Sequence, residues 1–167
     1  MTKPAGSVPR RRHVRFVVAA VAVAATDLIS KLVATAYLDA EGIDLPGPLD
    51  LRMAYNSGVA FSLGRDAPTW LIITLTSGVA AAIGVVAWRG MFASSLAAGV
   101  VVGGAVANLI DRVQAGTVVD MLYTGWWPTF NLADVAVVGG AFALVITDWA
   151  APQTTNRPRQ QPAHPSE

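Results

Sequence analysis

Four apolar segments, each about as long as a membrane-spanning helix, constrain this chain more than any other feature of its sequence. They cover residues 14–38, 69–88, 92–110 and 132–149, to within a few residues. A helix needs about 20 mostly apolar residues to cross the hydrocarbon core of a bilayer, because each residue advances it by about 1.5 Å. Only 14% of the residues are charged, against about a quarter in soluble domains. We therefore predict a membrane all-α core of four transmembrane helices, forming a single domain over residues 1–150.

The two ends of the chain lack this apolar pattern. Residues 1–13 combine basic residues with proline and glycine, and we predict a disordered basic arm there. The first apolar segment could also belong to a cleavable secretory signal, but its pattern continues to Tyr37, beyond the hydrophobic core of a signal. We therefore favour an uncleaved first span. Residues 151–167 are rich in proline and glutamine, which predicts a disordered cytoplasmic tail.

The distribution of charge predicts the orientation of the chain. Arginines precede the first span, separate the second from the third and follow the fourth: Arg10, Arg11, Arg12, Arg15, Arg89, Arg157 and Arg159. With four spans these segments share one side of the membrane, which the positive-inside rule makes cytoplasmic. Both termini are therefore expected in the cytoplasm. The polar segment of residues 39–66 is mainly acidic and is expected outside, where the alternation over residues 49–55 indicates a half-exposed strand.

Polar side chains in and beside the spans are predicted to converge at the outer face of the membrane. Asp27 and Lys31 are four residues apart in the first span, so they share a helix face and can form an ion pair. The other members come from the third span, the loop after it and the start of the fourth span: Asn108, Asp111, Arg112, Asp120, Asn131 and Asp134. Ionisable groups at membrane depth are costly and indicate a functional site. The pairs Asp27–Lys31 and Asp111–Arg112 could alternatively serve only to tether helices.

Asp120 and Asp134 are the two carboxyl groups best suited to activate water. Each borders an apolar run, where an ionised acid is costly. Two facing carboxyl groups can share one proton, because two like charges a few ångströms apart do not both ionise readily. Such a pair suits water-mediated hydrolysis of a peptide bond. The structural alternative is that Asp120 caps a turn and Asp134 caps the next helix.

Other chemistries fit the sequence less well. The chain has no cysteine, and its histidines, His13 and His164, lie beside the arm and in the tail, so they are too remote for a Ser–His or metal site at the cluster. A Ser–Lys site is disfavoured, because Ser30 and Lys31 face different sides of a helix and nothing in the sequence brings Ser57 near Lys31. The competing class is non-enzymatic: a small transporter or assembly protein that conducts ions or binds lipid. No metal, organic cofactor or nucleic-acid partner is expected.

These motifs resemble those of bacterial lipoprotein signal peptidase (signal peptidase II), a family of aspartic peptidases. The resemblance covers nearly the whole membrane core. It rests on five motifs: Asp27 with Lys31, YNSGVAFS at residues 55–62, GGAVANLIDR at residues 103–112, VVD at residues 118–120 and FNLAD at residues 130–134. Val59 and Ala107 stand where the family usually has alanine and glycine.

The resemblance implies an endopeptidase that removes the signal peptide from diacylglyceryl-modified prolipoproteins, immediately before the lipidated cysteine. It implies that Asp120 and Asp134 are catalytic, and that other residues bind substrate or support the pair: Asn56, Gly58, Asn108, Arg112, Asn131, Asp27, Lys31 and Asp111. It also implies a small extracytoplasmic β-sheet over residues 49–63 that cradles the substrate, and inhibition by globomycin-type cyclic peptides. The expected location is the bacterial cytoplasmic membrane, with the active site at the outer leaflet. Nothing suggests an obligate assembly, so a monomer is expected.

Overall fold

A computed structural model of the protein describes residues 8–39, 41–58 and 68–151. It contains four helices and two strands, in the order α1 (Arg10–Tyr37), β1 (Asp50–Asn56), α2 (Thr69–Trp88), α3 (Ser95–Ala115), β2 (Val118–Tyr123) and α4 (Leu132–Trp149). All four helices are long and apolar enough to cross a membrane. The strands form a two-stranded antiparallel sheet. The predicted class, four transmembrane helices with a small sheet, is confirmed.

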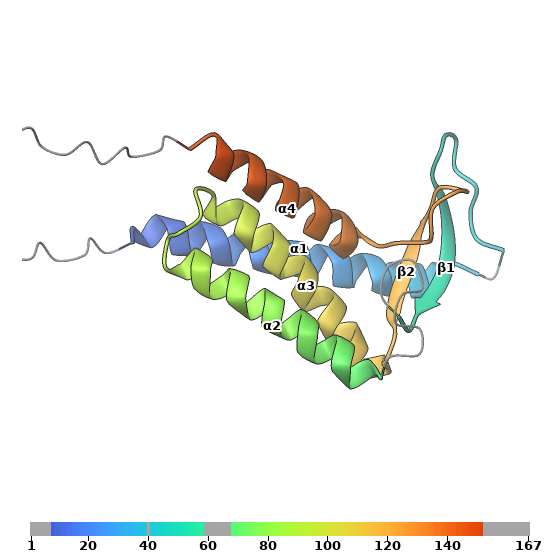
Figure 1. Ribbon diagram of the computed structural model, residues 1–167. Coiled ribbons are helices and arrows are strands. Elements are labelled where there is room, and N and C mark those ends of the chain that lie inside the picture. The colour runs from blue at the N-terminus through green and yellow to red at the C-terminus, as the bar shows by residue number, and fades with distance from the viewer. Residues whose placement is uncertain (1–7, 40, 59–67, 152–167) are drawn as a thin grey trace, which may run out of the picture.

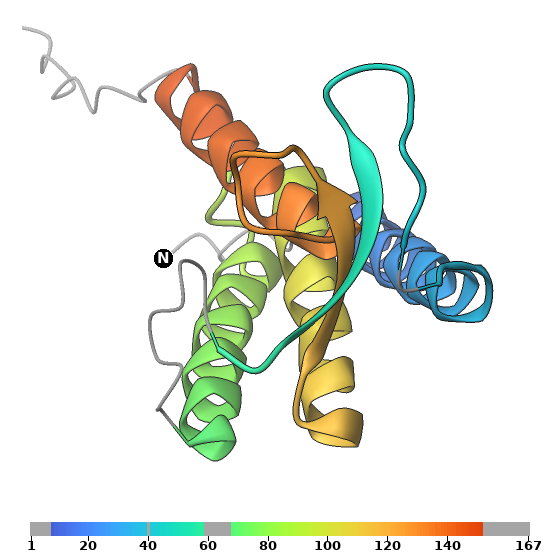
Figure 2. The ribbon, with the colours of Figure 1, turned by 90° about the vertical axis from the view of Figure 1, so that its right-hand side faces the viewer.

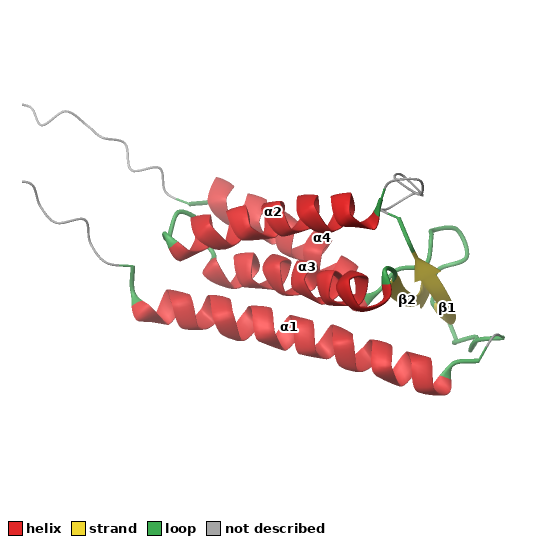
Figure 3. Ribbon diagram, turned by 90° about the horizontal axis from the view of Figure 1, so that it is seen from below, coloured by secondary structure: helices red, strands yellow, loops and turns green. Residues whose placement is uncertain are grey.

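The helices form a bundle with α3 at its centre, and the sheet lies across one end. α3 packs against each of the other three helices. In Figure 1 both ends of the described chain leave the bundle at the end opposite the sheet. Figure 2, which looks at the sheet end, shows the strands passing across the ends of the helices, and Figure 3 shows α1 running along the side of the bundle. The sheet can therefore hold side chains over one end of the bundle only.

Two helices depart from their expected bounds. The helix α1 begins at Arg10, so residues 10–13 of the predicted basic arm form its first turn. Pro9 occupies the N-cap position with φ −58°, and proline, which lacks an N–H, is compatible with a helix start. The third helix covers Ser95–Ala115, against an expected span of about residues 92–110; the hydroxyl of Ser94 caps its start by accepting a hydrogen bond from the backbone N–H of Ala97 at 3.1 Å. Residues 1–7 and the tail from residue 152 lie outside the described residues.

The loop between α2 and α3 is bound to both terminal helices at the end of the bundle opposite the sheet. Arg12 of α1 donates hydrogen bonds to the carbonyl oxygens of Phe92 and Ala93. Asp148 of α4 accepts a hydrogen bond from the backbone N–H of Ala93 at 2.6 Å. Asp148 therefore has a structural role that is remote from the sheet.

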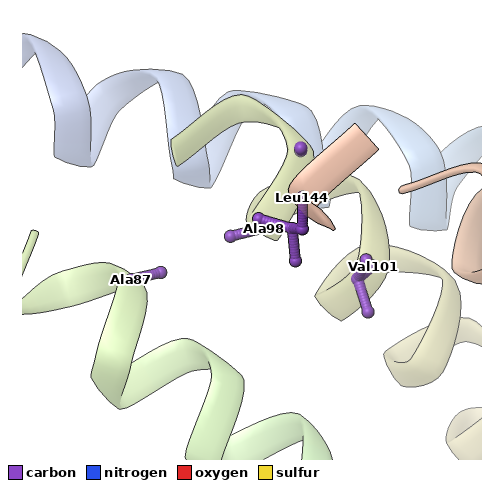
Figure 4. Packing of buried hydrophobic residues seen from close by; sticks show 5 residues of the cluster. Ala87, Ala98, Val101 and Leu144 are labelled. Carbon is purple, nitrogen blue, oxygen red and sulfur yellow. The ribbon is translucent and has the colours of Figure 1, made fainter. Parts of the chain in front are cut away.

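Small residues on α3 allow the helices to approach closely. Ala87, Ala98, Val101 and Leu144, from α2, α3 and α4, form the apolar core (Figure 4). A Cβ atom at Gly103 would lie 2.5 Å from the carbonyl oxygen of Ala20 in α1. In lipid, which solvates large apolar side chains as well as a protein core does, helices associate through such close backbone packing. α3 is therefore the scaffold that fixes the neighbouring helices.

We expect Gly103→Ala to lower the free energy of unfolding by about 1–3 kcal/mol, because the added methyl group overpacks the contact with α1. Gly139→Ala is the matched control, because a Cβ there meets no atom within 4 Å and alanine favours the helix. Thermal unfolding of both variants in detergent micelles checks this. A loss of stability in Gly139→Ala that equals the loss in Gly103→Ala would contradict close packing as the cause.

Candidate active site

Asp120 is held by a strand, whereas the sequence predicted it in a loop. The helix α3 ends at Ala115 and is capped by Gly116, whose φ of 73° reverses the chain, and β2 begins two residues after the cap. In the sheet Asp120 lies opposite Ala54 of β1. The strand partner comes from a segment more than sixty residues earlier, so local sequence gives little sign of the pairing. Asp120 therefore has a fixed backbone on the sheet.

The chain after β2 turns back onto the strand and brings the start of α4 beside Asp120. The backbone N–H groups of Met121 and Leu122 both donate to the carbonyl oxygen of Phe130, at 3.0 and 2.8 Å. The N–H of Phe130 donates to the carbonyl oxygen of Leu122 at 3.0 Å. Asn131, the next residue, thus lies close to the strand that carries Asp120.

Asn131 and Asp134 form a capping box at the start of α4. The side-chain Oδ1 of Asn131 accepts from the N–H of Asp134 at 2.9 Å, and Oδ2 of Asp134 accepts from the N–H of Asn131 at 3.3 Å. The capping role considered for Asp134 is therefore present. It leaves Oδ1 of Asp134 for a second contact, a hydrogen bond from Nδ2 of Asn108 at 2.9 Å.

Asn131 binds both aspartates. Besides its bonds with Asp134, its Nδ2 donates to Oδ1 of Asp120 at 2.7 Å and to Oδ1 of Asn108 at 3.1 Å. Asn56 of β1 donates to Oδ2 of Asp120 at 3.2 Å. Asn131 and Asp120 are 0% and 2% exposed, so hydrogen bonds from the side-chain amide groups take the place of water around the carboxyl group of Asp120. Two acids from different elements thus accept hydrogen bonds from one buried residue, Asp120 from its side-chain amide and Asp134 from its backbone N–H.

The pKa of Asp120 is raised to about 6. Burial is the largest cause, because it penalises the charged form, and the negative charge of Asp134 adds to it. The hydrogen bonds from Asn131 and Asn56 stabilise the carboxylate and partly oppose the rise. Asp120 is therefore a carboxyl group able to exchange a proton near neutral pH.

Lys31 is the centre of a second polar cluster, which is joined to the aspartates through Asn108. Its Nζ lies 2.6 Å from Oδ2 of Asp27 and 2.8 Å from Oδ2 of Asp111, and it donates to Oδ1 of Asn108 at 2.9 Å. The predicted Asp27–Lys31 ion pair is confirmed, whereas Asp111 pairs with Lys31 and not with Arg112. Nζ thus lies within 2.9 Å of two carboxylates and one amide oxygen, which favour its charged form, so Lys31 is poorly placed to serve as the base of a Ser–Lys site.

Arg112 contacts the chain two residues after β1. Its guanidinium donates to the carbonyl oxygen of Gly58 at 3.0 Å and to that of Asn108 at 3.4 Å. Gly58 is buried, and its N–H donates to Oδ1 of Asn56 at 2.9 Å. Residues 59–63 of the predicted cradle lie outside the described residues.

All ten predicted residues therefore lie at the sheet end of the bundle, and two contacts that they make with the main chain were not predicted. The backbone N–H of Val119 donates to Oδ2 of Asp111 at 3.4 Å, and that of Ala133 donates to Oδ1 of Asp27 at 2.8 Å. Almost every residue has a backbone N–H, so the residue type does not show which N–H will bind a carboxylate. The only sign in the sequence is that each of these two residues immediately precedes an aspartate.

Comparisons with known proteins agree on one family. The sequence model of "Signal peptidase (SPase) II" matches residues 19–150. A lipoprotein signal peptidase of Rhodococcus jostii strain RHA1 is 41% identical over 160 residues, covering 86% of this chain and 79% of that protein. One of Mycobacterium avium strain 104 is 36% identical over 157 residues, covering 87% and 84%. A bacterial membrane enzyme solved by the in meso method at 2.3 Å resolution has a similar fold, with a TM-score of 0.68 and 25% identity over 78% of this chain and 85% of that one.

We expect the pKa of Asp120, about 6 in the unaltered protein, to move in opposite directions in two variants. Asp134→Asn removes a neighbouring negative charge and lowers it. Asn56→Ala removes a hydrogen bond to the carboxylate and raises it. A pH titration of the ¹³C-labelled aspartate carboxyl signals in micelles measures both. Shifts of the same sign in the two variants would contradict these assigned causes.

Proposed function

The chain belongs to the signal peptidase II family, and from this premise we propose that Asp120 and Asp134 are the catalytic pair of its peptidase activity. It is a lipoprotein signal peptidase, an aspartic peptidase that cleaves signal peptides from prolipoproteins. The observation that carries the proposal is that Asn131, which is buried, donates to both carboxyl groups: its side-chain Nδ2 donates to Asp120, and its backbone N–H donates to Asp134. The metal-free chemistry that the pair supports is activation of a water molecule.

In the proposed mechanism the pair holds one proton between its two carboxyl groups. The ionised carboxyl group takes a proton from a water molecule, and the water oxygen attacks the carbonyl carbon of the scissile peptide bond. The protonated carboxyl group donates its proton to the carbonyl oxygen as the tetrahedral species forms. Collapse of this species breaks the C–N bond: the protonated carboxyl group gives its proton to the leaving nitrogen, and the ionised one takes a proton from a hydroxyl group of the tetrahedral species, so the pair again holds one proton. A pair this closely coupled titrates as a unit, so the two roles belong to the dyad.

We propose that cleavage occurs immediately before a diacylglyceryl-modified cysteine. A lipid anchor keeps the scissile bond at the membrane surface, which is the depth at which the end of a spanning helix such as α4 places Asp134. The sheet, crossing the bundle at this end, is proposed to cradle the substrate, with Asn56 and Gly58 at its edge. Arg112 is permanently charged and cannot act as a base, so we assign it to binding carbonyl groups of the substrate.

The proposed orientation places both termini in the cytoplasm and the sheet at the outer leaflet of the bacterial cytoplasmic membrane. The charges support it: Arg10, Arg11 and Arg15 lie at the end of the bundle away from the sheet, and Asp44 and Asp50 lie near the sheet. We also propose that the protein acts as a monomer, since one chain supplies both carboxyl groups. Inhibition by globomycin-type cyclic peptides is the pharmacological expectation that accompanies this assignment.

We expect Asp120→Asn and Asp134→Asn each to lower the rate of signal-peptide release from a lipidated prolipoprotein by about 10²–10⁴-fold, because each removes one partner in proton transfer. A gel assay with purified protein in micelles measures the rate. Asp148→Asn is the matched control, because it changes a carboxyl group that binds the loop at the far end of the bundle. Full processing by either dyad variant would exclude the pair as the catalyst.

A further inference from the structure

We propose that Lys31 is a positioning residue that sets the separation of the two catalytic aspartates, by holding the main chain immediately before each of them through Asp27 and Asp111. The inference rests on the catalytic roles proposed above for Asp120 and Asp134. It assigns to Lys31 a function in the reaction that goes beyond neutralising buried charge.

The ammonium group of Lys31 has three oxygen atoms close to it. Lys31 is 4% exposed, and its Nζ forms ion pairs with Asp27 and Asp111 at 2.6 and 2.8 Å and a hydrogen bond to Asn108 at 2.9 Å. These three residues belong to α1 and α3. A cation with partners on two helices fixes their relative positions, because moving any one of them weakens an electrostatic contact in a medium of low dielectric.

The two carboxylates that pair with Lys31 each bind the main chain beside a catalytic aspartate. Oδ1 of Asp27 accepts from the N–H of Ala133 at 2.8 Å, and Ala133 immediately precedes Asp134. Oδ2 of Asp111 accepts from the N–H of Val119 at 3.4 Å, and Val119 immediately precedes Asp120. One carboxylate thus holds the start of α4 and the other holds β2. Both segments that carry a catalytic aspartate are bound to the same ammonium group through a single side chain each.

The side-chain amides of Asn108 and Asn131 are each held in one orientation. Oδ1 of Asn108 accepts from Lys31, so its Nδ2 has to face Oδ1 of Asp134. The capping contact with the N–H of Asp134 fixes Oδ1 of Asn131, so its Nδ2 has to face Asp120 and Oδ1 of Asn108. Neither amide can turn over without placing like atoms against each other. Lys31 therefore sets the direction of the Asn108 donor as well as the position of the backbone, and Oδ1 of Asn108, held by Lys31, supports the same orientation of Asn131.

The chemistry of lysine suits this place better than that of arginine. An ammonium group presents its three hydrogens in a tetrahedral arrangement, whereas a guanidinium group is a planar fork that matches one carboxylate edge-on. Asp27 and Asp111 belong to different helices, and the side chains are 0% and 12% exposed. We therefore expect Lys31→Arg to keep the charge and lose the geometry.

The closing experiment compares Lys31→Met, Asp111→Asn and the control Asp148→Asn in the full-length protein, by steady-state cleavage of a lipidated prolipoprotein in micelles. We expect kcat to fall about 10²-fold in Lys31→Met, the loss that a displacement of roughly 1 Å produces, while KM changes little. Asp111→Asn should lower kcat in the same way, and the two changes combined should cost less than the sum of their separate effects on the activation free energy. Asp148→Asn should keep the unaltered kcat.

Two further readouts separate positioning from mere stability. The positive charge of Lys31 lowers the pKa of Asp120, so this pKa should rise in Lys31→Met. In Lys31→Arg the pKa should return to its value in the unaltered protein, whereas kcat should stay low. If Lys31→Met does not fold, as judged by thermal unfolding, Asp111→Asn tests the same contact with the ammonium group in place.

Unchanged kcat in folded Lys31→Met or Asp111→Asn would overturn the proposal, and so would full recovery of kcat in Lys31→Arg. Asp120→Asn, assayed in parallel, separates this outcome from failure of the proposed function. An inactive Asp120→Asn beside an active Lys31→Met refutes only the positioning role. An active Asp120→Asn refutes the catalytic pair itself.

Discussion

The ion pairs of Lys31 with Asp27 and Asp111 are the interaction on which the rest of the polar structure depends. Buried charges at the end of an apolar bundle are tolerated only when they are paired and hydrogen-bonded. Here one cation joins acids from two helices, and these acids bind the main chain of a strand and of a third helix. The same contacts that neutralise charge therefore hold Asp120 and Asp134 in place, which makes stability and activity difficult to change separately.

The scaffold beneath this network is rigid because α3 is built largely from small residues. Gly103 lets α1 approach closely. Gly104 does the same for the start of α4, because a Cβ atom at Gly104 would lie 2.6 Å from the carbonyl oxygen of Ala133.

The burial of Asp120 lowers the stability of the folded protein at neutral pH. Its folded-state pKa, about 6, lies above the ordinary value of 3.8, so the stability that its protonated form contributes is present below pH 3.8 and is lost as the pH rises through 6. The protein thus keeps a reactive acid at neutral pH at the expense of stability.

Much of this arrangement is predictable from the sequence, and the exceptions have physical reasons. The length of the apolar segments predicts the spans, and the i, i+4 spacing predicts the Asp27–Lys31 pair. Adjacent residues point in different directions from a helix, so the partner of Asp111 is Lys31 on another helix rather than Arg112. The pairing of β2 with β1 joins segments far apart in the chain, and sequence patterns register only local preferences. The charges of residues 10–12 favour the prediction of a disordered arm, but arginine is a good helix former, and these residues begin α1.

The most direct test of the central claim is a crystal structure of the protein with a peptide-like inhibitor that carries a hydroxyl group in place of the scissile carbonyl. The hydroxyl oxygen takes the place of the attacking water. The account predicts that it lies within hydrogen-bond distance, about 2.5–3.0 Å, of a carboxyl oxygen of Asp120 and of one of Asp134 at the same time. A hydroxyl group bound to only one of the two aspartates, with the other turned away, would contradict it.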